Sequence, residues 1–135
     1  MTSPRPRILS IGYDTLVFDT RNRILEFAGF EVVGCFRGNG ALDRFRSESF
    51  EAVVIGHSVP GSMRLRLVRE LKRAKPRIPV LVIQEAGESG QDLIEADAVC
   101  DSLDHPDVLI KTVSRLMGFP PRSVRTIAVR ATIAG

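Results

Sequence analysis

The sequence has few cysteines and no long hydrophobic stretch. Its two cysteines, Cys35 and Cys100, are too few for a disulfide framework and lack the paired spacing of a metal-binding motif. No apolar run approaches the roughly 20 residues that a helix needs to cross a bilayer. The chain begins with the basic stretch MTSPRPR, which leads into a short strand-like run and not into the apolar core of a secretory signal. We therefore expect a cytoplasmic protein with two small, buried thiols.

The composition is that of an ordinary globular domain. Hydrophobic residues make up 44% of the 135 residues and charged residues 26%, which argues against disorder. A chain of this length buries about two thirds of its unfolded surface, so a core can form without covalent staples. The net charge of +3 is too small to indicate a class of partner.

Charge is distributed unevenly, and one stretch has no positive side chain. Residues 85–107 carry eight acids and no lysine or arginine, whereas residues 64–77 carry seven basic residues and one acid. We expect the two stretches to lie side by side and to support weak, salt-sensitive association with a second copy or a partner. The basic stretch lacks the aromatic residues and groove-entering motif of a nucleic-acid-binding segment, so a solvated face or a protein-docking surface is favoured. The candidate interaction surface is Arg66, Arg69, Lys72, Arg73, Glu88, Asp92 and Glu95.

Five apolar runs of strand length alternate with segments of helical length. The runs span 8–11, 31–35, 52–55, 80–83 and 98–100, and several are continuous and β-branched, as is typical of parallel strands covered on both faces. The helical segments span 15–28, 39–49, 62–74, 87–96 and 104–117. Their periodicity places Val17 and Val108 on inward faces, with Asp104 capping the last helix and Gly118 ending it.

This alternation predicts an α/β fold with a doubly wound, five-stranded parallel sheet and right-handed crossovers. In such sheets, ligands bind at the carboxyl ends of the strands. The residues expected at that edge are Gly12, Tyr13, Asp14, Gly56, His57, Gln84, Glu85, Asp101 and Ser102.

Five short segments carry a resemblance to a known family. They lie at 6–11, 28–32, 50–55, 59–61 and 78–83, in order and at matching spacing. Over about residues 6–118 the chain resembles the receiver domains of bacterial two-component response regulators, the CheY-like family. The resemblance implies a flavodoxin-like (βα)5 fold with strand order 2-1-3-4-5. Another flavodoxin-like domain is the alternative.

The resemblance also implies a phosphotransfer site, but its residues are missing. Family receivers hold Mg²⁺ with an acidic pair after strand 1, accept a phosphoryl group on an aspartate ending strand 3, and place a hydroxyl and a lysine at the ends of strands 4 and 5. Here the acidic pair falls on Gly12 and Tyr13, the acceptor on Gly56, the hydroxyl on Gln84 and the lysine on Ser102. We therefore expect a degenerate receiver, a pseudo-receiver, with no metal and no cofactor.

Other strand-end residues have ordinary interpretations. Asp14 is favoured as the cap of the helix at 15–28 over a metal ligand. His57 is favoured as a loop histidine over a general base, because no acid lies near it in sequence. The stretch from Gln84 to Ser102 is about one helical turn shorter than in other receivers, which removes part of the fourth helix.

The segment 119–135 follows the receiver-like domain, 1–118. Pro120 and Pro121 break the last helix, and residues 124–133 alternate like a strand. We expect an extra C-terminal strand that docks or swaps onto a sheet edge, and a linker is the alternative.

These expectations combine into one functional hypothesis. The chain is predicted to be a phosphorylation-independent interaction module of two-component signal transduction, not an enzyme, with a signalling protein or a second copy as its partner. One alternative is a ligand-sensing domain that uses the emptied pocket around Gly12, Gly56 and Gln84. Another is a phosphorylated receiver with displaced acids at Asp14 and Asp101.

Overall fold

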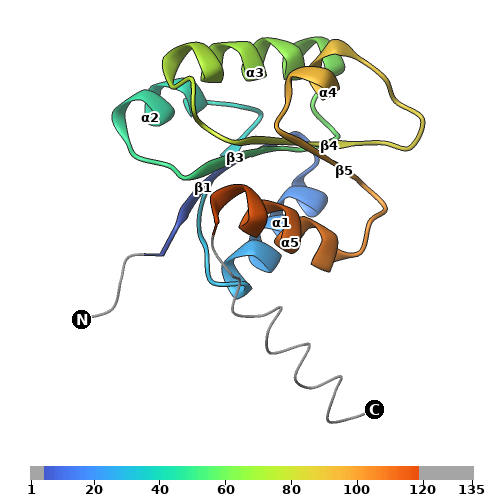
Figure 1. Ribbon diagram of the computed structural model, residues 1–135. Coiled ribbons are helices and arrows are strands. Elements are labelled where there is room, and N and C mark those ends of the chain that lie inside the picture. The colour runs from blue at the N-terminus through green and yellow to red at the C-terminus, as the bar shows by residue number, and fades with distance from the viewer. Residues whose placement is uncertain (1–4, 119–135) are drawn as a thin grey trace.

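A parallel five-stranded sheet lies at the centre of the fold (Figure 1). The structure is a computed structural model that describes residues 5–118. The strand order is β2-β1-β3-β4-β5, and every pair is parallel, which confirms the predicted α/β architecture. The strands are β1 (Arg7–Gly12), β2 (Glu31–Phe36), β3 (Ala52–Ile55), β4 (Val80–Gln84) and β5 (Ala98–Asp101).

Helices cover both faces of the sheet. In Figure 1, α1 and α5 lie together on one face, and α2, α3 and α4 lie on the other. The helices are α1 (Thr15–Phe27), α2 (Ala41–Ser47), α3 (Gly61–Ala74), α4 (Gln91–Glu95) and α5 (Pro106–Met117). None of these helices is long and apolar enough to cross a membrane, as judged over residues 5–118.

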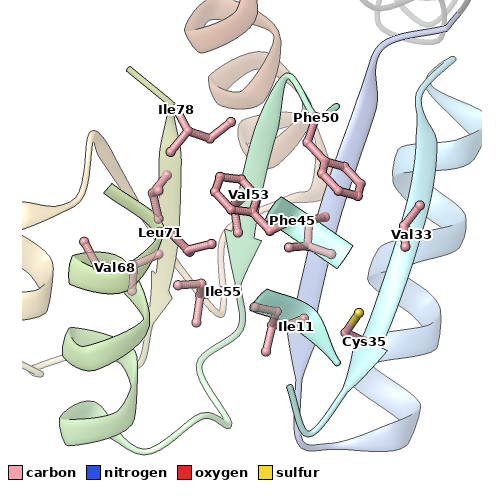
Figure 2. Close-up of a cluster of buried hydrophobic side chains, with 14 of the residues drawn as sticks. Ile11, Val33, Cys35, Phe45, Phe50, Val53, Ile55, Val68, Leu71 and Ile78 are labelled. Carbon is pink, nitrogen blue, oxygen red and sulfur yellow. The ribbon is translucent and has the colours of Figure 1, made fainter. Parts of the chain in front are cut away.

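The continuous apolar strands supply two separate cores. In β3, Val54 faces the α1–α5 side, whereas Val53 and Ile55 face the α2–α3 side. Figure 2 shows the second of these cores, where Phe45 of α2 and Leu71 of α3 meet the strands. Burial on both faces is the reason that these strands lack polar alternation.

The face of α1 differs from the prediction. Val17 is 38% exposed, and Phe18 is buried in its place. The Phe18 ring fits because β1 and β2 have glycine at the two positions that it faces. A Cβ at Gly12 or Gly34 would lie 2.8 Å from the ring. Two strand glycines thus make room for an aromatic ring and set the rotation of the helix.

The start of α5 also differs from the prediction. His105, not Asp104, is the N-cap, and its ring Nδ1 accepts a hydrogen bond from the Asp107 N–H. The Asp104 carboxylate instead accepts from the Asp101 N–H, which closes the turn after β5. The later start shifts the buried stripe, so Val108 is 40% exposed, while Gly118 ends the helix in the left-handed conformation as expected.

Three remaining expectations concern α4, the cysteines and the last segment. The predicted helix at 87–96 is reduced to α4, Gln91–Glu95. Cys35 on β2 and Cys100 on β5 are buried free thiols on opposite edges of the sheet, as predicted. The predicted strand at 124–133 and the whole segment 119–135 lie outside the described residues.

Truncation of Leu71 tests the α2–α3 core. Leu71 is fully buried, so Leu71→Ala should lower the free energy of unfolding by about 2–5 kcal/mol. The matched control is Leu103→Ala, since Leu103 is 87% exposed and its truncation should change stability by less than about 0.5 kcal/mol. Urea denaturation measures both, and equal losses would contradict the described packing.

Candidate functional site

The predicted strand-end residues meet at one edge of the sheet. Gly12 is the last residue of β1, and Gly56 directly follows β3, the strand that pairs with β1. Gln84 is paired with Asp101 at the ends of β4 and β5. The Oγ of Ser58 accepts hydrogen bonds from the N–H groups of Tyr13 (2.9 Å) and Asp14 (3.1 Å). The loops after β1 and β3 are therefore tied together.

Arg21 of α1 fills the space between the two glycines. Its guanidinium is buried, and Nη2 donates to the Ser10 hydroxyl and to the Ile11 carbonyl, both at 3.0 Å. A Cβ at Gly56 would lie 2.5 Å from Nη1, and a Cβ at Gly12 would lie 3.2 Å from Nη2. A side chain at the acceptor position would thus occupy the place of the guanidinium.

The charge of Arg21 has no counterion among the described residues. No ion pair of residues 5–118 includes it, and its buried Nε has no hydrogen-bond partner. Burial lowers the pKa of Arg21 to about 10, which still leaves the group protonated at neutral pH. A single buried cation therefore lies where the resemblance implies carboxylates and Mg²⁺.

Asp14 acts as a helix cap. Its carboxylate accepts a hydrogen bond from the Val17 N–H at 3.1 Å, and its extended backbone precedes the first turn of α1. This geometry agrees with the favoured interpretation. Over residues 5–118, no group of three or more histidine, cysteine, aspartate or glutamate side chains is placed to hold a metal ion.

The remaining strand-end side chains are engaged by one another. The Gln84 amide donates to Asp101 Oδ1 at 2.7 Å, and the Ser102 N–H donates to the Gln84 carbonyl at 2.7 Å. His57 is half-buried, and its Nε2 lies 3.8 Å from a carboxylate oxygen of Glu85. The acid that the sequence did not place near His57 thus comes from the end of β4.

A cavity of about 360 Å³ opens at this edge, between α1 and α5. Arg21, His57 and Asp101 line it together with apolar side chains. This cavity is not the pocket predicted around Gly12, Gly56 and Gln84, because none of the three lines it and the guanidinium of Arg21 lies beside the two glycines.

The acidic and basic stretches lie side by side, as predicted, and they pair within the chain. Arg64 of α3 is buried and contacts both Glu88 and Asp92, with 3.0 Å between its Nε and Asp92 Oδ2. Arg69 binds Glu95 through two hydrogen bonds of 2.9 and 2.7 Å. A third pair joins Lys72 to Asp97.

This pairing corrects the predicted interaction surface. Asp92 is 4% exposed and belongs to the contact between α3 and α4, not to an open face. Glu88, Glu95, Arg69 and Lys72 are engaged in the same contact. Arg66 and Arg73 stay exposed, and Arg66 pairs with Glu70 along its own helix.

The same ion pairs shift the titration of the carboxyls. A hydrogen bond from Arg64 holds the pKa of Glu88 below its ordinary value, and the Glu85 N–H adds to the effect. Arg69 lowers the pKa of Glu95 in the same way. Because these folded-state values are depressed, the pairs stabilise the fold above the ordinary carboxyl pKa and lose that effect as the pH falls.

Sequence reasoning missed Arg21, although a signal was present. Phe18, Arg21, Leu25 and Ala28 recur at helical spacing, which places the arginine on the buried stripe of α1. An arginine at such a position needs a space free of side chains, and Gly12 and Gly56 provide it.

Replacing Asp14 separates a cap from a metal ligand. Asp14→Ala should lower the free energy of unfolding by about 1 kcal/mol, because the Val17 N–H loses its acceptor. Asp14→Asn keeps an acceptor and should stay close to the wild type. Urea denaturation measures both, and equal losses in the two variants would show that the carboxylate charge matters more than the cap.

Removing Asp92 tests the contact between α3 and α4. Asp92→Ala should cost about 3 kcal/mol, because it leaves the buried Arg64 short of a charge partner. The control, Glu70→Ala, breaks the exposed pair with Arg66 and should cost less than about 1 kcal/mol. Thermal or urea unfolding gives both values, and a small loss for Asp92→Ala would refute a structural role for the buried pair.

Known proteins provide an independent comparison, although no family model matches the chain. The chain is 29% identical to the response regulator MprA of Mycolicibacterium vanbaalenii over 118 residues, which cover 87% of the chain and 51% of that protein. It is 27% identical to MprA of Mycobacterium tuberculosis H37Rv, with 87% and 51% covered. The chain thus spans about half the length of these curated relatives.

Solved structures share the fold. The receiver domain protein from Methanospirillum hungatei has a TM-score of 0.74 at 21% identity, with 84% of this chain and 94% of that chain covered. The regulator TrrA from Thermotoga maritima, solved with Mg²⁺-BeF, has a TM-score of 0.73 at 21% identity, with 82% and 98% covered. The chain is thus similar in sequence to response regulators and shares the fold of CheY-like receiver domains.

Proposed function

We propose that the chain is a phosphorylation-independent receiver domain that acts as a protein-interaction module in cytoplasmic two-component signalling. The observation that carries this proposal is the position of Arg21, whose Nη1 lies 2.5 Å from where a side chain at Gly56 would begin. The domain is then not an enzyme and uses no cofactor.

Phosphoryl transfer to a receiver needs a nucleophile and a divalent cation. Gly56 has no side chain, and backbone glycine supplies no nucleophile. A cation bound beside Gly12 and Gly56 would lie next to the guanidinium of Arg21. Two positive charges in contact repel strongly in a buried site. Gly56 therefore removes the nucleophile, and Arg21 opposes the binding of the cation.

The alternative with displaced acids has less support. The Asp14 carboxylate accepts a hydrogen bond from the first turn of α1, and Asp101 accepts from Gln84. Asp14 follows β1 and Asp101 ends β5, and β3 and β4 separate these strands in the sheet, so the two acids do not form a pair. Ser102, at the expected lysine position, brings no positive charge that could balance a phosphoryl group.

The region from α3 to α4 supports a fixed conformation. The short helix α4 is joined to α3 through Arg64 and Asp92, with Arg69 and Glu95 beside them. A segment held by several ion pairs keeps one surface without a chemical trigger. The partner therefore binds this constant surface, and its binding does not depend on phosphorylation of the domain.

Exposed apolar side chains near β5 give that surface its character. Ile94 of α4, Leu103 after β5 and Val108 of α5 are exposed, and Val99 of β5 is partly so. All four lie on or between α4, β5 and α5, at the β5 edge of the sheet, and the proposal assigns the contact with the partner to this edge. A signalling protein or a second copy of the chain fits this face better than a nucleic acid, because Asp101 and Asp104 lie on the same edge.

Treatment with a phosphoryl donor tests phosphorylation independence. The protein is incubated with acetyl phosphate and Mg²⁺, and its intact mass is recorded; we expect no change. TrrA from Thermotoga maritima, run in parallel, serves as the receiver control. An acid-labile, stoichiometric increase of about 80 Da in this chain, the mass of a phosphoryl group, would refute the proposal.

A further inference from the structure

The cavity between α1 and α5 is lined by apolar side chains and by several polar ones, Arg21 among them. Its volume is about 360 Å³, and its walls include Leu16, Val17 and Ile24 of α1, Ile83 of β4 and Leu109 of α5. The side chain of Arg21 forms part of the lining at the end of the strands. A space of this size, with apolar walls and few polar groups, is typical of a small-molecule site.

Arg21 has binding capacity that the fold does not use. Both of its hydrogen bonds come from Nη2, to Ser10 and Ile11, and within residues 5–118 its Nη1 donates none. No carboxylate of residues 5–118 forms an ion pair with it. A buried cation without a counterion is unfavourable, and an anion in the adjacent cavity would relieve that cost.

The lining defines the chemical class of the anion. Both hydrogens of Nη2 are already donated to Ser10 and Ile11, so a carboxylate accepts a charge-assisted hydrogen bond from Nη1, and the apolar walls require an apolar body. Asp101 and Asp104 also line the cavity, and their negative charges disfavour a doubly charged phosphate. A volume near 360 Å³ limits the ligand to a small molecule.

We propose that this cavity binds a small monocarboxylate with an apolar body, whose carboxylate pairs with Arg21. The ligand contacts α1 and α5 at once, so its binding joins two helices on the same face of the sheet. This inference goes beyond the proposed function, because it gives the domain an input that needs no phosphoryl chemistry.

Titration of the ¹⁵N-labelled chain with three carboxylates tests the proposal. The probes are benzoate, 3-phenylpropanoate and hexanoate, each compared with its neutral primary amide and with inorganic phosphate. At least one carboxylate should shift the amide signals of Thr20, Arg21 and Ser102 in a saturable way. Its amide should bind at least about tenfold more weakly, and phosphate should not bind. No saturable shift with any carboxylate, or equal binding of acid and amide, would overturn the proposal.

Two pairs of variants locate the site. Arg21→Met should abolish carboxylate binding, whereas Arg21→Lys keeps a cation and should retain part of it. Since Arg21 is buried and its loss can affect folding, Val17→Trp blocks the cavity from its exposed wall. Val108→Trp is the matched control, because Val108 has similar exposure, 40% against 38%, and does not line the cavity.

Val17→Trp should weaken carboxylate binding at least about tenfold, and Val108→Trp should leave it unchanged. Equal effects of the two tryptophan variants would overturn the assignment to this cavity. The titration contains no phosphoryl donor, so its failure is distinguishable from a failure of the proposed function.

Discussion

The contact of Arg21 with the ends of β1 and β3 determines the character of the whole strand-end site. The guanidinium fits because Gly12 and Gly56 carry no side chains, and Phe18, one turn earlier in α1, fits for the same reason against Gly12 and Gly34. A carboxylate at position 56 would need the space that Arg21 occupies. The three strand glycines thus set the rotation of α1 by accommodating Phe18 and Arg21. The same placement of Arg21 makes the strand-end site positively charged.

The opposite side of the molecule follows a different constraint, which is the neutralisation of charge within the chain. The basic helix α3 and the acidic segment around α4 would each repel themselves if they stood apart. Arg64 enters the interior only because Glu88 and Asp92 accompany it. The short α4 is thereby held against α3, and the apolar side chains beyond it remain available for contact with another protein.

The sequence predicted those features that depend on local pattern. The central strands β1, β3 and β4 were visible because strands buried on both faces need continuous apolar runs, and Asp14 was recognisable as a cap from its place before α1. For α1, periodicity alone left two stripes open, one with Val17 and one with Phe18 and Arg21. Val17 and Phe18 are both apolar, and the choice between them depends on glycines in other strands. The segregation of charge was evident, but whether it pairs within the chain depends on where α4 lies.

The central claim is that the guanidinium of Arg21 permanently occupies the strand-end site. Hydrogen exchange of the Arg21 Nε–H group, followed by ¹⁵N NMR and assigned with Arg21→Lys, tests it most directly. We expect a slowly exchanging signal, because Nε is buried, in contrast to the rapid exchange of Arg66, whose side chain is 80% exposed. An Arg21 signal that exchanges as fast as that of Arg66 would show that the side chain lies in solvent and would contradict the account.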